Sequence, residues 1–489
     1  MRFLTSCICF IALVFTLHTP LQTDDMTAAV VAAVGGDTTG MTALESASTG
    51  GMPRLSRALA RLESHRRLLM LAAHPDDEDT RALAWLAQTG GEAAYLSLNR
   101  GEGGQNLIGD ELGVGLGLIR SRELLAARQV DGARQYFSRA YDFGFTRSLD
   151  ETLTRWSREV LIEDSVRVIR RFKPQVLVSV FPPDERAGHG HHQAAGVLAA
   201  EVIEAAADPT LFPELGPAWR VTTLFRSAWW DPSAATVRFS LGTLDRFNGR
   251  SIMQTALASR SQHRSQDMGL VQPLGHATGA LIWESGGDGT PSTELFTGVD
   301  TELEAIAALL PEGETRDAVA AHLFDIASRA GLTRWSVLTL TPQEAASAVA
   351  QIVQALDEAI SIVSGIESDG AIHARQLLVE KRSIAVEALA TAAGIAADAW
   401  TDREEVVAGA ELEVQAELWS SAGVEVGEVR IEPRGWPLVS STEREAEGRR
   451  FRTEVTAART LVVQVPADAK PSVPYFLENP LDGDLFDWT

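Results

Sequence analysis

The fold of this chain is decided by the stretch LLMLAAHPDDE, residues 68–78. Its first six residues form a short apolar run that stops at a turn-forming His-Pro pair, which is typical of a strand buried on both faces. Similar apolar runs lie at 93–98 and 175–181, and helical patterns lie between them at 80–88 and 118–132. Strands that alternate with helices predict an open, mostly parallel α/β sheet, in which ligands bind beyond the carboxyl ends of the strands.

The length and charge of the chain limit its class. Its 489 residues exceed one ordinary core and predict about three domains. It carries 43 Lys and Arg against 66 Asp and Glu, a formal net charge of -23. Proteins that bind the phosphate backbone of nucleic acids concentrate positive charge, so the acidic balance excludes that class and predicts no nucleic-acid partner.

The N-terminus is typical of a secretory signal. Arg2 precedes an apolar run at 3–17, which is shorter than the ~20 residues that span a bilayer. We therefore predict a signal peptide over residues 1–23 and an exported, periplasmic or extracellular protein without a stable membrane span. An uncleaved anchor and a buried N-terminal strand are the alternatives. Cleavage would remove the only cysteines, Cys7 and Cys9, so that any metal must be held by His, Asp or Glu.

Four segments follow the predicted signal. Residues 24–54 are rich in Thr, Ala and Gly and are interpreted as a linker, and 55–300 contain the α/β pattern. Residues 301–400 are Ala-rich and predict helices, one of them starting at the capping sequence Thr-Pro-Gln-Glu, 341–344. Residues 405–489 alternate apolar and polar positions and predict a small β-sandwich-like domain. Its aromatic end is typical of the middle of a module, which leaves a truncation open.

The first candidate ligand loop follows the strand at 68–73. His74 and Asp77, at i and i+3, can meet on one side of a tight turn that Pro75 helps to form. Of the neighbouring carboxylates of Asp76 and Asp77, one can bind a divalent cation while the other faces water, and the cation relieves their repulsion. The alternative is that the acidic run caps the helix at 80–88 and His74 only ends a strand.

The second candidate loop follows the strand at 175–181. His189, His191 and His192 lie within four residues, ahead of a helical pattern at 193–206. Imidazole is the commonest nitrogen ligand of Zn²⁺, and the spacing from 189 to 192 lets one ring bind a metal while the other faces an open coordination position. A solvated His-rich loop is the alternative. Two such loops after two parallel strands predict that one divalent cation is shared between them.

With these loops the sequence resembles the PIG-L (LmbE-like) N-acetylglucosaminyl deacetylases. The matching motifs are AHPDDE (73–78), RGEGG (100–104), IRxxEL (119–124) and the loop from His189 to His192. The match is close over 68–196 and extends to HRSQ at 263–266. It implies a Rossmann-like α/β fold, one Zn²⁺ ion and hydrolysis of the acetamido group of an N-acetylated aminosugar or glycoconjugate.

The resemblance also implies roles for individual residues. It assigns the zinc to His74, Asp77 and His192, general-base duty to Asp76, and oxyanion or acid support to His189. A protonated His189 would stabilise the developing negative charge. We therefore expect activity to fall at alkaline pH.

Several neighbouring residues have open roles. Family members often carry Asp where this chain has His191, which could compete for the metal or replace that Asp as a partner. Arg120 and Glu123 are spaced as a structural ion pair on a helix. Residues 141–144, Tyr-Asp-Phe-Gly, fit a pocket lining or the core equally well.

The candidate substrate-binding residues follow the second strand. Arg100 and Glu102, joined by Asn106, lie in a Gly-rich segment that suits sugar hydroxyls, and a salt-bridged turn is the alternative. The resemblance adds His263. Three functions are thus predicted in this order: a zinc N-deacetylase, a zinc amidase for a larger N-acyl or thiol-conjugate substrate, and a non-catalytic carbohydrate-binding protein.

Overall fold

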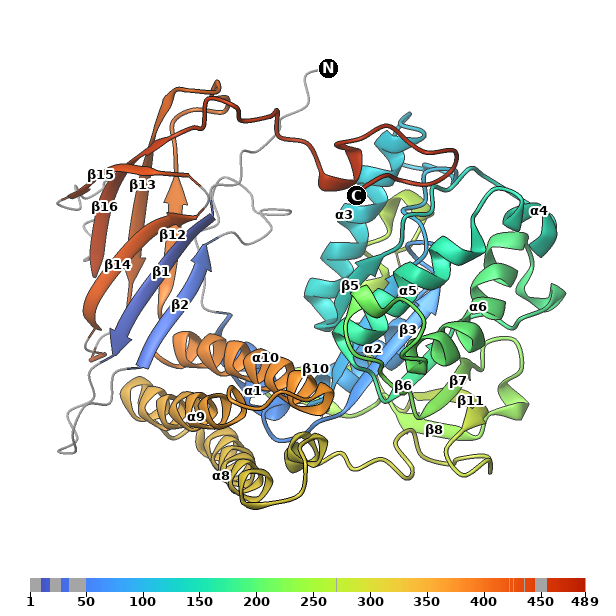
Figure 1. Ribbon diagram of the computed structural model, residues 1–489, viewed down its shortest axis with the longest axis horizontal. Coiled ribbons are helices and arrows are strands. Elements are labelled where there is room, and N and C mark those ends of the chain that lie inside the picture. Colours follow the sequence, from blue (N-terminus) through green and yellow to red (C-terminus); the bar gives the residue numbers. More distant parts are fainter. Residues whose placement is uncertain are drawn as a thin grey trace. The chain divides into compact units, whose positions relative to one another are not determined.

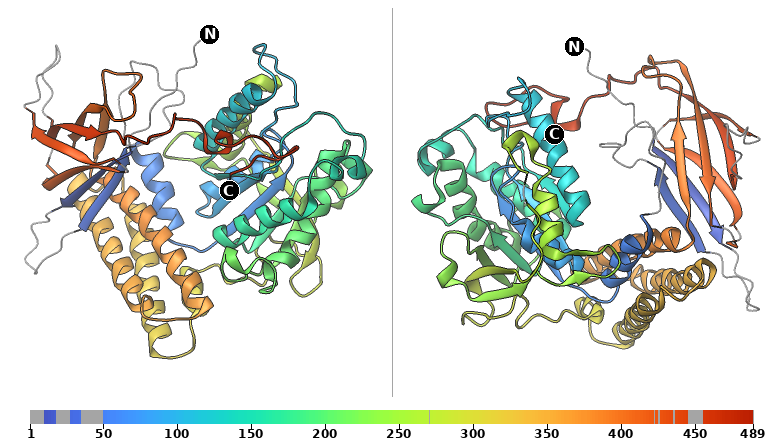
Figure 2. Two further views of the ribbon diagram at one scale, coloured as in Figure 1. Left: turned by 45° about the horizontal axis from the view of Figure 1, so that its top comes forward. Right: turned by 180° about the vertical axis from the view of Figure 1, so that it is seen from behind.

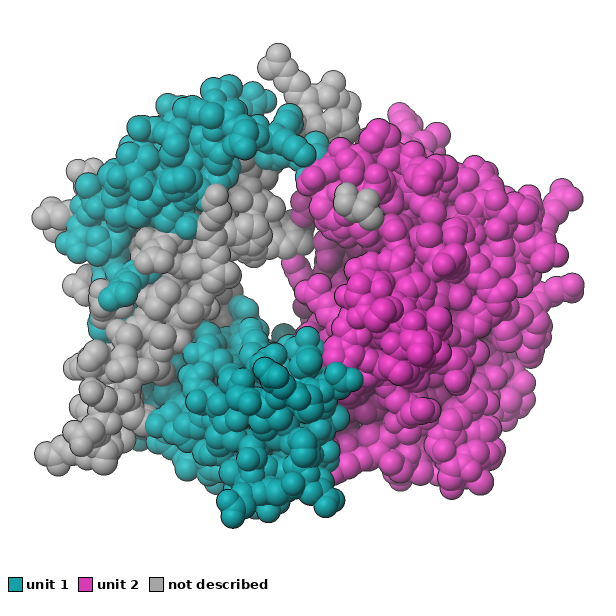
Figure 3. Space-filling view, in the orientation of Figure 1, with its two compact units in different colours: residues 1–63, 306–474 teal, residues 64–305, 475–489 magenta. Residues whose placement is uncertain are grey.

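The structure is a computed structural model that describes residues 10–17, 28–34, 50–269, 271–421, 423–424, 426–434, 436–444 and 455–488. The chain forms two compact units, and each unit combines two separate stretches of chain (Figure 3). Residues 64–305 and 475–489 make up the α/β unit, and residues 1–63 and 306–474 make up the helix–sheet unit.

The α/β unit is built on a seven-stranded sheet in the order β5-β4-β3-β6-β7-β11-β8 (Figure 1). Its strands are β3 (Arg67–Ala72), β4 (Glu92–Ser97), β5 (Arg134–Phe137), β6 (Val176–Ser179), β7 (Thr223–Ser227), β8 (Val237–Ser240) and β11 (Thr278–Gly286). The first five strands in this order are parallel to their neighbours, whereas β11 is antiparallel to both β7 and β8. All six residues of β3 are buried, and the predicted mostly parallel α/β sheet is confirmed.

The connections between the strands contain the helices of this unit and set the strand order. The helices of this unit are α2 (Thr80–Gln88), α3 (Val114–Asp131), α4 (Leu149–Leu153), α5 (Arg158–Phe172), α6 (Gly190–Ala207) and α7 (Ile252–Arg260), and a short hairpin joins β9 (Leu244–Asp245) to β10 (Arg250–Ser251). From β3 the chain proceeds outward to β4 and β5, then returns to β6 on the other side of β3. The strand order therefore reverses between β3 and β6, the position at which open α/β sheets bind their ligands.

The helix–sheet unit contains a bundle of α1 (Gly51–Arg61), α8 (Glu314–Ser336), α9 (Pro342–Val363) and α10 (Asp369–Ala392). The predicted capping sequence is confirmed, because Glu344 N–H donates to Thr341 Oγ1 and Thr341 N–H donates to Glu344 Oε2. By length and composition α9 is apolar enough to cross a membrane, but half of its most apolar stretch is buried in the bundle, as in the core helix of a folded domain.

Two antiparallel sheets complete this unit. One has the order β12-β13-β16-β15 and the other β14-β1-β2. The strands are β1 (Phe10–Leu17), β2 (Ala28–Val34), β12 (Ala396–Trp400), β13 (Glu411–Trp419), β14 (Val426–Arg434), β15 (Leu438–Glu443) and β16 (Ala457–Gln464). Every second residue of β13 from Leu412 to Leu418 is buried, as the alternation predicts.

The structure divides the chain differently from the sequence at three places. Residues 10–17, inside the predicted signal peptide, form β1, while 1–9 and 18–27 lie outside the described residues. The predicted linker at 24–54 contains β2, because its AAVVAAV stretch has the β-branched residues that strands favour. Residues 475–488, predicted to belong to the β-rich domain, pack in the α/β unit.

Candidate metal centre

The loop after β3 forms a tight turn that brings His74 and Asp77 together. His74 N–H donates to Asp77 Oδ2 at 2.7 Å, and Asp77 N–H donates to His74 O at 3.3 Å. Between them Asp76 adopts a φ of 96°, a left-handed conformation that Asp tolerates better than most residues. The turn leaves His74 Nδ1 3.1 Å from Asp77 Oδ2, as the i to i+3 spacing predicts.

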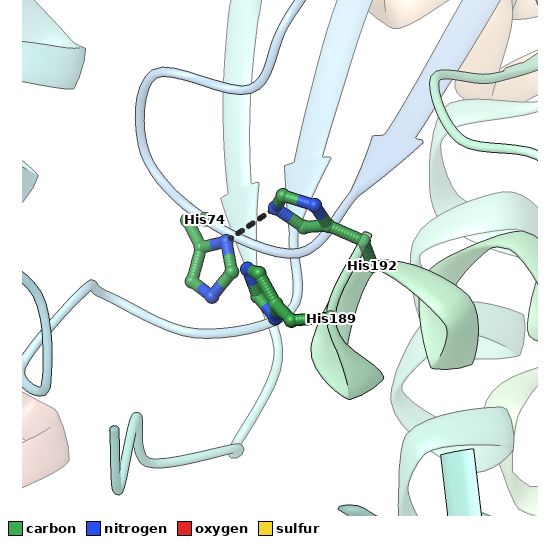
Figure 4. Close-up of side chains that lie close together, drawn as sticks. All are labelled: His74, His189 and His192. Atoms are coloured by element: carbon green, nitrogen blue, oxygen red, sulfur yellow. Dashed lines mark hydrogen bonds between the residues drawn. The ribbon is translucent and has the colours of Figure 1, made fainter. Parts of the chain in front are cut away.

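The loop after β6 delivers His192 to the same point. His192 lies in the first turn of α6, and its Nε2 is 3.2 Å from His74 Nδ1 and 3.3 Å from Asp77 Oδ1. Its Nδ1–H donates to Ala187 O at 3.0 Å. A neutral imidazole that donates from Nδ1 keeps its lone pair on Nε2, so the ring presents an acceptor atom to the other two residues. Figure 4 shows the imidazoles of His74 and His192 meeting there beside that of His189.

These donor atoms fit a divalent cation. Ligand atoms about 2.0–2.1 Å from a tetrahedral ion lie roughly 3.3–3.4 Å apart. His74 Nδ1 lies 3.1 Å from Asp77 Oδ2 and 3.2 Å from His192 Nε2, and His192 Nε2 lies 3.3 Å from the other carboxylate oxygen, Asp77 Oδ1. Two loops far apart in the sequence therefore converge as predicted, and the His/His/Asp cluster is consistent with a metal site.

The electrostatics of the cluster suit a cation. Burial opposes ionisation of Asp77, but the adjacent His192 and His74 outweigh it and hold the pKa of Asp77 well below its usual value. Burial likewise tends to lower the pKa of His74, whereas Asp77 and Asp142 raise it above the usual value. The carboxylate of Asp77 is thus ionised and ready to pair with positive charge.

His189 lies beside His74 and His192, and the three imidazoles form a group whose ligand nitrogens lie within 4.8 Å of one another. The ring centroid of His189 lies 3.8 Å from that of His192 and 5.8 Å from that of Phe145, an exposed ring. Burial and the nearby His192 and His74 lower the pKa of His189 to about 3, so this imidazole is neutral at neutral pH. The expectation of a protonated His189, and of activity lost at alkaline pH on its account, is therefore corrected. A neutral ring can still donate one N–H.

Asp76 is held by Arg120, the residue that the sequence spacing pairs with Glu123. Arg120 Nη2 donates to Asp76 Oδ1 at 2.8 Å and to Pro75 O at 2.5 Å, and Arg120 Nη1 donates to Gly101 O at 3.1 Å. A Cβ on Gly101 would lie 2.3 Å from Arg120 Nη1, which explains why the guanidinium needs glycine there. Burial raises the pKa of Asp76, and Arg120 opposes that effect.

The predicted Arg120–Glu123 pair does not form. Glu123 instead accepts bonds from Ser265 N–H at 2.7 Å and Ser265 Oγ–H at 2.6 Å, joining α3 to the distant HRSQ segment. The i to i+3 rule places the two side chains on one helix face, but each finds a stronger partner in the tertiary structure. The sequence contains no local signal for these longer-range contacts.

His191, whose role the sequence leaves open, contacts His74, Asp142 and Trp156 in the structure. Its Nδ1 lies 3.0 Å from His74 Nε2, on the far side of that ring from Asp77. The carboxylate of Asp142 is 3.8 Å from both of these nitrogens, and the ring of His191 stacks on Trp156 at 4.2 Å. His74, Asp142 and His191 thus form a second, fully buried donor cluster. This arrangement supports His74 from behind, as partners of metal-bound histidines do.

The candidate substrate residues Arg100, Glu102 and His263 are buried rather than presented to a substrate. They expose 3%, 2% and 0% of their surface. Glu102 Oε2 accepts from Arg100 N–H at 3.3 Å, and burial raises the pKa of Glu102 to about 7. His263 Nε2 lies 2.7 Å from Glu78 Oε1, underneath the His74 loop. Direct contact with a substrate would require these side chains to move.

Asn106 closes an exposed loop instead. Its Oδ1 accepts from Ile108 N–H and Gly109 N–H, both at 3.1 Å, and its Nδ2–H donates to Glu111 O at 3.1 Å. Isolated Asn side chains commonly make such local turns. The loop itself carries the exposed side chains of Leu107 and Ile108, so that it offers apolar surface near Asn106.

The chain is similar to several known proteins. Residues 69–203 match the family model described as PIG-L, GlcNAc-PI de-N-acetylase. The chain is 33% identical over 180 residues, 33% of its length and 60% of the relative's, to the 1D-myo-inositol 2-acetamido-2-deoxy-alpha-D-glucopyranoside deacetylase of Geodermatophilus obscurus. It is 32% identical over 209 residues, 38% of its length and 62% of the relative's, to deacetylase 1 of the same name from Catenulispora acidiphila.

The chain thus spans about 60% of the length of these curated relatives. Among solved structures, it aligns with the N,N'-diacetylchitobiose deacetylase from Pyrococcus horikoshii at a TM-score of 0.33 and 20% identity, over 41% of this chain and 70% of that one.

Proposed function

Because residues 69–203 match the PIG-L family model, we propose that this protein hydrolyses the N-acetyl group of an N-acetylglucosamine-type sugar or glycoconjugate. The observation that carries the proposal is the convergence of His74, Asp77 and His192, with Asp76 beside them. The curated relatives are named as deacetylases of an inositol-linked acetamido sugar, which supports an acetylated aminosugar conjugate as the substrate class.

We propose that one Zn²⁺ ion is the cofactor, held by His74, Asp77 and His192. When bound, such an ion polarises a carbonyl group and makes water more acidic. Two nitrogen donors and one carboxylate oxygen match the three-ligand sets of catalytic zinc sites, which keep a position open. His191 and Asp142 would hold the ring of His74 in place from its other nitrogen.

The residues of the chain would divide the reaction among them. Asp76 takes the proton of the attacking water and later gives it to the leaving amine, while Arg120 fixes one of its carboxylate oxygens. Neutral His189 donates a hydrogen bond to the carbonyl oxygen as it becomes negative. The carbonyl carbon gains a bond to the water oxygen and loses its bond to nitrogen, which gives acetate and the free amine.

The test is acetate release by the full chain from a panel of soluble and lipid-linked N-acyl glucosamines of increasing acyl size. We expect acetyl substrates to be preferred, about one equivalent of zinc per chain, and loss of activity on chelation that added Zn²⁺ restores. Preference for larger acyl groups would replace the proposal with the amidase. Sugar binding without acetate release from zinc-loaded protein would indicate a non-catalytic carbohydrate-binding protein.

We also propose that the protein is exported, on the basis of Arg2 and the apolar run that follows it. The expected result is a mature protein outside the cytoplasm. Its intact mass should place its N-terminal residue between Thr19 and Ala28. Such cleavage would remove β1 and its pairing with β14. A chain recovered in the cytoplasm starting at Met1 would contradict export, and a full-length chain in the membrane fraction would favour the uncleaved anchor.

A further inference from the structure

The last part of the chain, residues 475–488, joins the α/β unit and is called the C-terminal segment below. Figure 1 and both views of Figure 2 show it in red beside the upper end of α3. It pairs with the backbone directly after β5: Phe486 N–H donates to Arg139 O at 2.7 Å, and Tyr141 N–H donates to Asp484 O at 2.9 Å. The segment is therefore joined by backbone hydrogen bonds to the loop that follows β5 and continues to Asp142.

Side chains secure this pairing. Asp484 accepts two bonds from Arg155, at 2.6 and 2.8 Å, in a forked geometry that fixes direction as well as distance. Phe486 is only 2% exposed, and its ring packs edge-on against Tyr141 and Phe476. Burial of a phenylalanine ring is strongly stabilising because it removes a large apolar surface from water, so this residue is the main anchor of the segment.

The segment also accounts for the burial of Arg100. Arg100 Nη2 donates to Tyr475 Oη at 2.9 Å, and its guanidinium carbon lies 3.6 Å from the ring centre of Phe476 and 4.0 Å from that of Phe137. A guanidinium between two aromatic faces is favourable when it is shielded from water. The cation predicted to bind substrate is thus engaged within the chain, by a residue 375 positions away.

Glu102 connects the metal centre with the two places that the C-terminal segment contacts, Arg100 and the backbone of 139–141. Its Oε2 accepts from Arg100 N–H at 3.3 Å and from Asp142 N–H at 3.1 Å. Asp142 in turn places its carboxylate 3.8 Å from His74 Nε2 and from His191 Nδ1. The C-terminal segment holds the chain on both sides of this connection, at Arg100 and at the backbone of 139–141.

We propose that the C-terminal segment is a positioning element of the metal centre, which keeps Asp142 beside His74 and His191. This inference rests on the proposed function in one respect, namely that the metal centre concerned is the one proposed to carry out deacetylation. Partners that orient a ligating histidine typically change metal affinity by about 10–100-fold when they are lost. Loosening the segment should therefore weaken metal binding without removing any ligand.

The experiment measures the Zn²⁺ dissociation constant of the full chain by chelator competition, together with hydrogen exchange of the peptide over 139–146. We expect Phe486→Ala to raise the dissociation constant about 10-fold, to speed exchange in that peptide, and to lower kcat by a similar factor. Phe486→Leu should restore most of the affinity. Glu478→Gln, at an exposed position of the same segment, is the control and should change nothing.

Should Phe486→Ala fail to fold, Asp484→Asn and Tyr475→Phe carry the same test, with smaller expected losses of about 2–5-fold because each removes polar contacts alone. The proposal is overturned if the melting temperature falls while zinc affinity and exchange at 139–146 stay within twofold of the unmodified chain. If that chain releases no acetate but Phe486→Ala still weakens zinc binding, the proposed function fails and the positioning role stands.

Discussion

Asp76→Asn is expected to lower the turnover of acetylated substrate by about 10²–10⁴-fold, the usual contribution of a general base. The amide keeps the size of the side chain and can still accept the bond from Arg120, but it cannot take a proton from water. Asn also tolerates the left-handed φ of 96° at this position, so the turn that brings His74 to Asp77 should persist.

The structure favours Asp76 over its neighbour for this role. The side chain of Asp76 is 20% exposed, and only its Oδ1 is held by Arg120, which leaves Oδ2 for a water molecule. Both oxygens of Asp77 face imidazoles instead, Oδ2 toward His74 and Oδ1 toward His192. Adjacent carboxylates therefore have separate tasks, because successive side chains of the turn point in different directions.

Steady-state kinetics, zinc content and melting temperature together check this prediction. Zinc content and melting temperature of Asp76→Asn should match those of the unmodified chain, so that the loss lies in the chemical step. Asp110→Asn makes the same chemical change in an exposed loop and should keep full activity. Activity of zinc-loaded Asp76→Asn within tenfold of the unmodified chain would assign the base to another residue.

The parts of the site that sequence could predict are those that depend on short stretches. A buried apolar run followed by His74 and Asp77 contains both the strand and the turn. The local spacing is therefore enough to predict that these two side chains meet. The meeting of His74 with His192 follows from one further step, since the ends of parallel strands share an edge of the sheet. Neither step requires knowledge of distant packing.

The parts that could not be predicted depend on contacts across the fold. Arg120 reaches Asp76 across 44 positions, and Arg100 reaches Tyr475 across 375. A charged residue in a Gly-rich loop has the same local pattern whether it meets a sugar or a tyrosine of its own chain, so periodicity carries no information about the choice. The sequence leaves Asp142 open between pocket lining and core, because a carboxylate gains its role from the imidazoles that face it.

The second large expected effect is the loss of zinc binding when His192, but not its neighbour His191, is replaced. His192→Ala is expected to abolish measurable zinc binding, whereas His191→Ala should weaken it by only about 10–100-fold. His192 Nε2 lies 3.2 Å from His74 Nδ1 and 3.3 Å from Asp77 Oδ1, and a zinc site that keeps only two protein ligands is incomplete. His191 faces the opposite nitrogen of His74 and so acts on the ion only through that ring.

This comparison separates the two donor clusters that share His74. If the cation belonged to the cluster of His74, Asp142 and His191, the order of the two variants would be reversed. Zinc binding is measured for both by chelator competition, with His276→Ala, an exposed histidine, as the control. The expected order follows from distances, since the nearest oxygens of Asp142 lie 3.8 Å from their imidazoles while those of Asp77 lie at 3.1 and 3.3 Å. Shared coordination of one ion requires the closer set, because donor atoms about 2.1 Å from a common centre cannot be much more than 3.4 Å apart at tetrahedral angles.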